Sequence, residues 1–285
     1  MKKITEQFLS GERALFQGRE LDISYTTFAE GESPLKESKN IQLYESNFKW
    51  KYPLWYAENI QMKKCTLFEM ARAGIWYTHH ISLEDCMIEA PKEFRRATDI
   101  HLKNVVFSNA EETLWNCSNV QMEQVTAKGN YFAMNSTDMK IDGFQLVGNY
   151  CFDGAKNVEI RNAKMLSKDA FWNAENITVY DSYISGEYLG WNSKNVKLVN
   201  CTIESLQGMC YCENLILENC RLVNTTLAFE YSTVQAEVKG KIGSVMNPES
   251  GFIHAEEIEE LIMDESKVNP KITDIVVDKG KADVI

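Results

Sequence analysis

Five of the six tryptophans fall at matching positions of a repeating pattern, and they are this sequence's best candidate for a ligand-binding surface. They are Trp55, Trp76, Trp115, Trp172 and Trp191, with Arg95, Met134 and Asp153 taking the same place between them. Indole faces flanked by carboxylates and amides suit sugar rings, whose C–H faces pack on aromatic rings. An outer apolar stripe of this size marks a binding surface more often than an accident. We therefore predict that an oligosaccharide or sugar derivative binds in a groove along this tryptophan column.

Charged residues near the column are the candidates for chemistry on such a ligand. The catalytic candidates are Asp153, Asp169, Glu112 and Arg95, and the further ligand-binding candidates are Arg96 and Glu187. In an enzyme the three carboxyl groups would serve as general acid and base, and the Arg95 guanidinium would stabilise charge. A structural interpretation stands beside this one. Asp153 precedes Gly154, a common turn pair, and Glu112 can simply pair with Arg95 across the repeat.

The tryptophan column also has two interpretations without a sugar. Aromatic residues in register pack well on one another, so the column is also consistent with a purely structural ladder. It is equally consistent with the protein-binding face of a non-catalytic scaffold. Whether the protein is an enzyme is left open at this point.

Sequence motifs give no reason to expect a metal or a cofactor. His79, His80, His101 and His254 are too few and too scattered for a convincing metal site. The H-E-x-x-H, phosphate-loop and G-x-S-x-G signatures are absent from the sequence. We expect neither a metal nor a cofactor.

The elements that position these residues follow from a short repeated phrase, in which a polar residue precedes an apolar, a polar and another apolar residue. Its first apolar residue falls at positions 41, 60, 81, 100, 120, 139, 158, 177, 196 and 215. Alternation with a period of two predicts strands with one buried face. Seven residues later, all ten positions are again apolar, from Phe48 to Leu222. The spacing predicts an all-β, single-stranded parallel β-helix of about 11 coils of about 19 residues.

Two further columns have structural roles. Asn, Asp or His comes before the first apolar residue in all ten phrases, and these residues tolerate the left-handed backbone conformation best after glycine. We predict a left-handed turn there in every coil. Cys65, Cys86, Cys201 and Cys220 share one position, where small buried thiols act as small hydrophobes.

Three segments give the chain a family resemblance: Lys49–Tyr56, Met70–Tyr77 and Ser185–Asn192. They resemble an uncharacterised bacterial family of pectin-lyase-like right-handed parallel β-helix proteins, a domain of unknown function. The resemblance runs from about Gly11 to Tyr231. It implies the right-handed coil and brings no activity or catalytic residue with it.

Composition and the chain ends complete the expectations. Residues 1–20 should cap the first coil, residues 21–231 form the helix, and residues 232–285 form a cap of the same domain. The net charge of −11 argues against a nucleic-acid partner. The N-terminus lacks the apolar core of a signal peptide and no apolar stretch is long enough to span a membrane, so we expect a cytoplasmic protein without a membrane partner. The oligomeric state is left open.

Overall fold

The structure is a computed structural model that describes residues 1–278. The chain divides into two compact units, Met1–Val147 and Gly148–Ile285. We call them unit 1 and unit 2 and describe each by itself. A stack of repeats can divide in this way because each coil contacts only its neighbours. Apart from two short 3₁₀ segments, the regular elements of the described residues are strands. Together the units hold a parallel β-solenoid of about 15 turns of about 19 residues.

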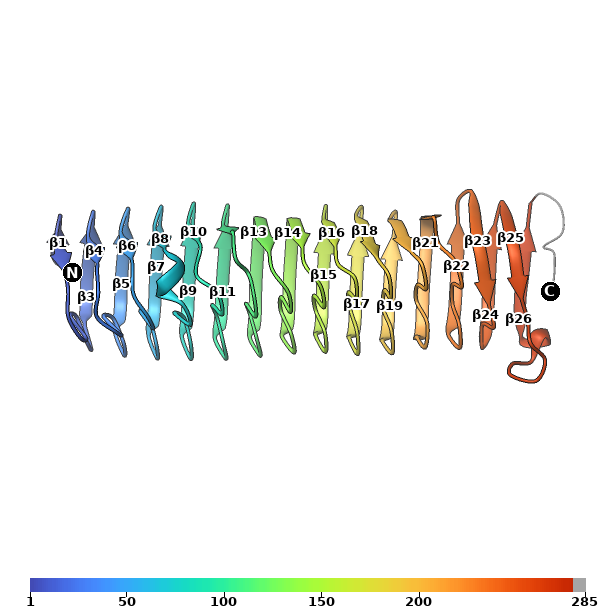
Figure 1. Cartoon of the computed structure of the whole chain (residues 1–285), viewed down its shortest axis with the longest axis horizontal. Coiled ribbons are helices and arrows are strands. Elements are labelled where there is room, and N and C mark those ends of the chain that lie inside the picture. The colour runs from blue at the N-terminus through green and yellow to red at the C-terminus, as the bar shows by residue number, and fades with distance from the viewer. Residues whose placement is uncertain (279–285) are drawn as a thin grey trace. The chain divides into compact units, whose positions relative to one another are not determined.

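Unit 1 is built from long and short strands that recur once per coil (Figure 1). Its elements are β1 (Lys2–Thr5), β2 (Phe8–Leu9), β3 (Arg19–Ser24), β4 (Thr27–Phe28), β5 (Lys39–Tyr44), β6 (Asn47–Phe48), β7 (Glu58–Lys63), β8 (Thr66–Leu67), η1 (Glu69–Ala71), β9 (His79–Glu84), β10 (Met87–Ile88), β11 (Thr98–Lys103), β12 (Val106–Phe107), β13 (Ser118–Lys128) and β14 (Thr137–Val147). Each long strand pairs in parallel with the next coil, so that Ile41 opposes Ile60 and Ile60 opposes Ile81. The predicted repeat and its register are confirmed.

Unit 2 continues the same pattern of parallel pairs. Its elements are β15 (Lys156–Arg161), β16 (Lys164–Leu166), β17 (Glu175–Tyr180), β18 (Tyr183–Gly186), β19 (Lys194–Val199), β20 (Thr202–Ser205), β21 (Glu213–Val223), β22 (Thr233–Val238), β23 (Lys241–Met246), β24 (Ser250–Ala255), β25 (Glu257–Ile262), η2 (Pro270–Ile272) and β26 (Thr273–Val277). Val158 opposes Ile177, which opposes Val196. Near the C-terminus β23 and β25 form a separate two-stranded sheet.

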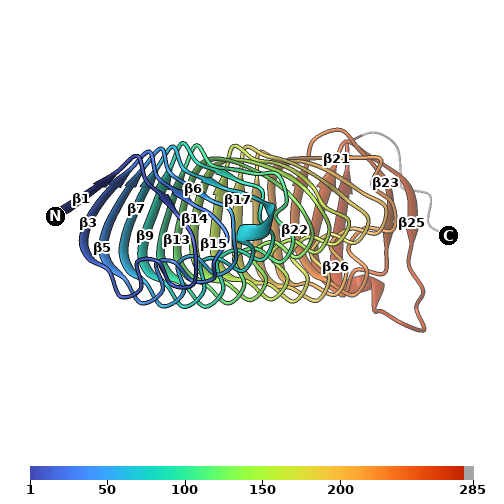
Figure 2. The same ribbon diagram turned by 60° about the vertical axis from the view of Figure 1, so that its left-hand side comes forward.

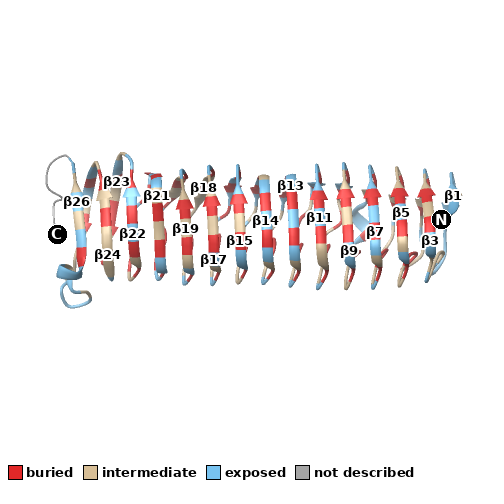
Figure 3. Cartoon of the chain, turned by 180° about the vertical axis from the view of Figure 1, so that it is seen from behind, coloured by how far each residue is buried: buried red, intermediate tan, exposed pale blue. Residues whose placement is uncertain are grey.

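Burial alternates along the strands as the period-two pattern predicted (Figure 3). The first apolar column and the one seven residues later are both buried; Ile60 and Leu67, for example, are 1% and 0% exposed. The polar residues between them are less buried, so each coil encloses a narrow apolar core. Figure 2 shows the path of the backbone around the coils. All eight cysteines are free and buried, which confirms that the four in the shared column are small core residues.

Left-handed turns come before the first apolar residue in all ten predicted coils. The φ angles at these Asn, Asp and His residues lie between 53° and 59°. Their side chains also bond along the axis: the Asn176 amide donates to Asn157, and the Asn195 amide donates to Asn176, each at 2.9 Å. The predicted turn is therefore confirmed, and a ladder of amides reinforces it.

The coils extend further toward both ends than the sequence predicted. Strand β1 already pairs with β3, with Lys2 opposite Leu21, so coil strands begin inside residues 1–20. Strands β22, β24 and β26 carry the parallel pairing beyond residue 231. The predicted range of the helix, residues 21–231, is thus too short, and the predicted count of about 11 coils is too low. Both fall short because the end coils lack the full repeated phrase. Among the described residues no helix is long and apolar enough to cross a membrane.

Candidate functional site

The tryptophan column faces outward, as predicted, but for a different reason. Strand alternation was expected to turn it outward, yet most of its members lie in a corner turn of the coil and not in a strand. From Phe94 onward the preceding column adopts positive φ, for example 57° at Leu114 and 62° at Phe171, while its side chains stay in the core; Leu54 and Ile75, in the coils of Trp55 and Trp76, do not. In the coils from Phe94 to Phe171, the left-handed residue has a buried side chain and the residue after it lies outside the core. The sequence does not reveal this turn, because large apolar residue types do not predict positive φ.

In unit 1 the column forms a continuous stack of Trp55, Trp76, Arg95 and Trp115, which we call the aromatic stack. The rings of Trp55 and Trp76 are nearly parallel, at 8°, with centroids 5.3 Å apart. The Arg95 guanidinium carbon lies 4.5 Å from the Trp76 ring centre and 4.6 Å from that of Trp115. Arginine therefore replaces a tryptophan without breaking the stack, because its planar cation packs on both indole faces.

The aromatic stack uses up the groups that a sugar would need. Each indole N–H donates to a backbone carbonyl of the next coil, at 2.5 Å for Trp55, 2.8 Å for Trp76 and 2.6 Å for Trp115. The ring faces contact one another along the coil axis, so ring edges are what the half-buried indoles offer to solvent. Sugar C–H groups pack on faces and not on edges. This geometry favours the structural interpretation of the stack.

The charged candidates of unit 1 pair across coils. Glu112 accepts from Arg95 at 3.1 Å and forms an ion pair with Lys92, also at 3.1 Å. The side chains of Arg95 and Glu112 are only 23% and 25% exposed, so this stretch is not an open groove wall. Arg96 is exposed, with its guanidinium 6.0 Å from the Tyr77 ring centre. These contacts correspond to the pairing interpretation of Glu112 and Arg95.

In unit 2 the structure brings together two of the predicted residues, Asp169 and Glu187. The Lys168 ammonium lies 3.3 Å from Glu187, and the field of that cation also reaches Asp169. Burial raises the pKa of the Asp169 carboxyl, although Lys168 and a hydrogen bond from Tyr150 oppose the shift. The Asp169 residue is 2% exposed and its Oδ2 atom has no hydrogen-bond partner. The prediction that Asp169 lies on an accessible wall is wrong, since the residue is buried.

The remaining candidates of unit 2 also make local contacts. Asp153 accepts a hydrogen bond from Asn173 at 3.1 Å, and Asn173 accepts one from Asn192 at 2.8 Å. Trp172 donates its N–H to the Tyr188 carbonyl at 3.1 Å, and its ring centre lies 6.2 Å from that of Trp191. Asp153 thus belongs to a ladder of amides and not to the Asp169 and Glu187 pair.

A buried acid that the sequence reasoning missed lies in unit 1. Glu93 is 0% exposed, and both carboxyl oxygens accept from the Gly74 N–H, at 2.9 and 3.0 Å. An added Cβ at Gly74 would lie 2.7 Å from Glu93 Oε2, so this approach requires glycine. Burial raises the pKa of Glu93 well above its usual value, although the Gly74 and Ile75 N–H groups favour the charged form. The available signal was its column, where the other coils place uncharged residues such as Pro53 and Thr113.

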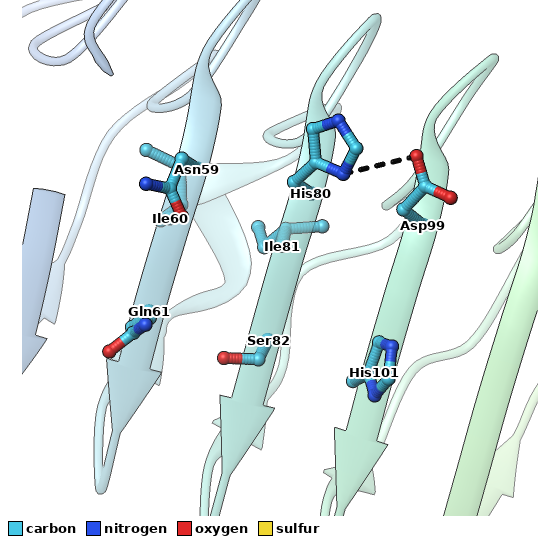
Figure 4. A pocket seen from close by; sticks show the side chains of 8 residues that line it. All are labelled: Asn59, Ile60, Gln61, His80, Ile81, Ser82, Asp99 and His101. Atoms are coloured by element: carbon cyan, nitrogen blue, oxygen red, sulfur yellow. Dashed lines mark ion pairs between the residues drawn. The ribbon is translucent and has the colours of Figure 1, made fainter. Parts of the chain in front are cut away.

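An open hollow lies over the outer face of β7, β9 and β11 in unit 1. Its volume is about 280 Å³, and its lining includes Gln61, Ser82 and His101, which lie side by side on the three strands (Figure 4). Ser82 is the shortest side chain of this outward column, so a gap opens between its longer neighbours. At one edge His80 Nδ1 lies 3.2 Å from Asp99 Oδ2. We call this site the polar hollow.

The polar hollow lies between two rows of paired groups. On one side the Asn59 amide donates to Asn40 at 2.6 Å, in the ladder of left-handed turn residues. On the other side Lys63 pairs with Glu84 at 2.9 Å. The residues between these rows, Gln61 and His101, are exposed. The structure gathers histidines that the sequence had left scattered, yet the described residues hold no cluster suited to a metal ion.

Comparison with solved structures finds β-helix proteins of very low identity. The A-module of mannuronan C-5 epimerase AlgE4 of Azotobacter vinelandii is 8% identical, with 100% of this chain and 91% of that chain covered and a TM-score of 0.33. A mutant tailspike protein of E. coli bacteriophage HK620 in complex with a pentasaccharide is also 8% identical, with 97% and 72% covered and a TM-score of 0.44. PfbA, a surface adhesin of Streptococcus pneumoniae, is 8% identical, with 93% and 71% covered and a TM-score of 0.30.

Sequence comparisons give one clear assignment. A search of curated proteins finds no match. A family model described as "Protein of unknown function (DUF3737)" matches residues 2–276, which is nearly the whole chain. The predicted resemblance to a β-helix family of unknown function is thereby confirmed, and the chain belongs to the DUF3737 family.

Proposed function

We propose that this protein binds an oligosaccharide, without covalent chemistry, in the polar hollow of unit 1. The observation that carries the proposal is an open hollow lined by an amide, a hydroxyl and an imidazole, from Gln61, Ser82 and His101, one on each of three consecutive coils. Parallel strands repeat about every 4.8 Å, which is close to the length of one sugar unit in an extended chain. Each sugar would therefore meet one coil.

The groups that line the hollow suit hydroxyl-rich ligands. Amide, hydroxyl and imidazole side chains both donate and accept hydrogen bonds, as sugar hydroxyls do. The polar groups on either side already have partners, Lys63 with Glu84 and His80 with Asp99, so binding in the hollow does not require a charged ligand. A donated hydrogen bond from Asn119 also lowers the pKa of Asp99 and keeps this carboxylate charged.

The test fills the hollow with an apolar side chain. Ser82→Leu should reduce binding to a glycan array of neutral and acidic oligosaccharides by at least about tenfold. Thr178→Leu is the matched control, because Thr178 holds the same outward position and the same partial burial in unit 2. Ile216 in this column shows that the strand accepts an apolar residue. Equal binding by both variants, or no glycan bound by the wild-type protein, would overturn the proposal.

A further inference from the structure

A second hollow lies in unit 2, where the row of short strands changes its pairing. Arg221 on β21 opposes Thr202 on the coil before it, whereas the following strand, β23, pairs with β25 in a separate sheet. The ladder therefore ends between β21 and β23, and a hollow of about 290 Å³ opens there. Its lining includes Arg221, Asn224, Lys239, Lys241 and Glu259.

This hollow is basic in a protein of net charge −11. Its lining carries three cations and one carboxylate. Glu259 forms an ion pair with Lys241, which neutralises that cation. Arg221 and Lys239 have no ion pair within the described residues, so the lining keeps two positive charges without an ion-pair partner. The Glu256 carboxylate, which accepts from the Gly240 N–H, lies beside the hollow and reduces this positive charge only in part.

Neighbouring polar groups are already engaged and leave these cations free. The Gly240 N–H donates to Glu256 at 3.0 Å, and the Gly243 N–H donates to the Thr225 carbonyl at 3.1 Å. The Asn224 amide donates to Glu204 at 3.1 Å. Recognition of a ligand would thus depend on the Arg221 guanidinium and the Lys239 ammonium.

We propose that this basic hollow binds a phosphate group, carried by a small phosphorylated ligand. The two unpaired cations match the double negative charge of a phosphate monoester. The fork of the guanidinium binds two phosphate oxygens at once, and the lysine adds a point charge. Because both cations are exposed, the affinity falls as ionic strength rises.

The experiment measures binding of inorganic phosphate to the full chain by calorimetry at fixed ionic strength, with chloride as the reference anion. Arg221→Gln and Lys239→Gln should each weaken phosphate binding by about tenfold. The control is Arg161→Gln, since Arg161 is also exposed in unit 2 but pairs with Glu159 at 3.0 Å. Circular dichroism checks that each variant stays folded.

Two results would overturn the proposal. One is the absence of phosphate binding to the wild-type protein. The other is an equal loss of affinity in the Arg161→Gln variant, which would mean that phosphate binding depends on the net charge of the protein and not on this hollow. The outcome is independent of glycan binding in unit 1, because Ser82→Leu leaves this hollow intact.

Discussion

At the scale of single residues, Glu93 is a fully buried acid of unit 1 with a raised pKa. A fully buried carboxyl with two N–H donors, and with no cation partner in residues 1–278, costs free energy when it ionises. Its raised pKa means that the folded protein binds this proton more tightly than the unfolded chain does. The stabilisation is complete below the unfolded pKa of glutamate, about 4.3, and is lost as pH rises through the raised pKa of the folded state.

We predict that Glu93→Gln makes stability less dependent on pH, because the neutral amide resembles the protonated acid. The melting temperature of the wild-type protein should fall more steeply than that of the variant as pH rises above about 4.3. Thermal melts across this range test it. Glu123→Gln, at an exposed glutamate of unit 1, is the control and should keep the wild-type slope. Parallel curves for Glu93→Gln and the wild type would contradict the prediction.

Arg95 gives a second test at this scale. Lysine keeps the charge but loses the planar face that packs between Trp76 and Trp115. We predict that Arg95→Lys lowers the free energy of unfolding by about 1 kcal/mol, the range of a partly desolvated cation–π contact. Urea unfolding measures it against Arg96→Lys, whose parent side chain is exposed. Equal stabilities of the two variants would argue against the stack.

The sequence could predict the outward direction of the tryptophan column but not the role of its members. Stacking depends on ring orientation, which the sequence does not give. In the sequence, Arg95 interrupts the column of tryptophans. Only coordinates reveal that a guanidinium continues the aromatic stack. Likewise, Asp169 looked exposed because charged residues usually are, and its burial depends on the packing of its own coil.

At the scale of elements, the left-handed turn before each long strand was predictable because residue type and position recur in ten coils. The corner turn that carries the tryptophans was not predictable, because phenylalanine and leucine rarely adopt the positive φ that Phe94, Leu114 and Phe171 have here. Core packing there overrides the local preference of the backbone. Periodicity thus revealed the strands and one turn, whereas the other corners depended on tertiary structure.

We predict that Asn176→Val and Asn195→Val each destabilise the protein by about 1 kcal/mol or more, and that Asn157→Val does the same. A β-branched residue resists the left-handed conformation, which here has φ of 54° to 58°. Thermal or urea unfolding checks this. Asn176→Gly separates the contribution of the left-handed turn from that of the amide ladder, because glycine keeps the turn and loses only the ladder. Unchanged melting temperatures for all three valine variants would contradict the turn assignment.

At the scale of the whole molecule, the reactivity of the eight buried thiols measures how readily the folded protein unfolds. Burial raises the pKa of Cys117 and Cys151 to about 12, so their reactive thiolate form is scarce near neutral pH. We predict that native protein reacts slowly with a thiol reagent and that all eight cysteines react after unfolding in urea. Rapid labelling of Cys65, Cys86, Cys201 or Cys220 in native protein would contradict their core position.

The uniform register of the coils has a consequence for how quickly the chain folds. In each unit almost every strand pairs with residues only one coil away, as Ile60 does with Ile41 and Ile81. Most all-β proteins fold slowly because their contacts join distant parts of the sequence. Here the sequence separation of paired residues stays near 19 however many coils are added, so the relative contact order resembles that of a helical bundle. Rapid folding that begins at any coil and spreads to its neighbours is the expected result.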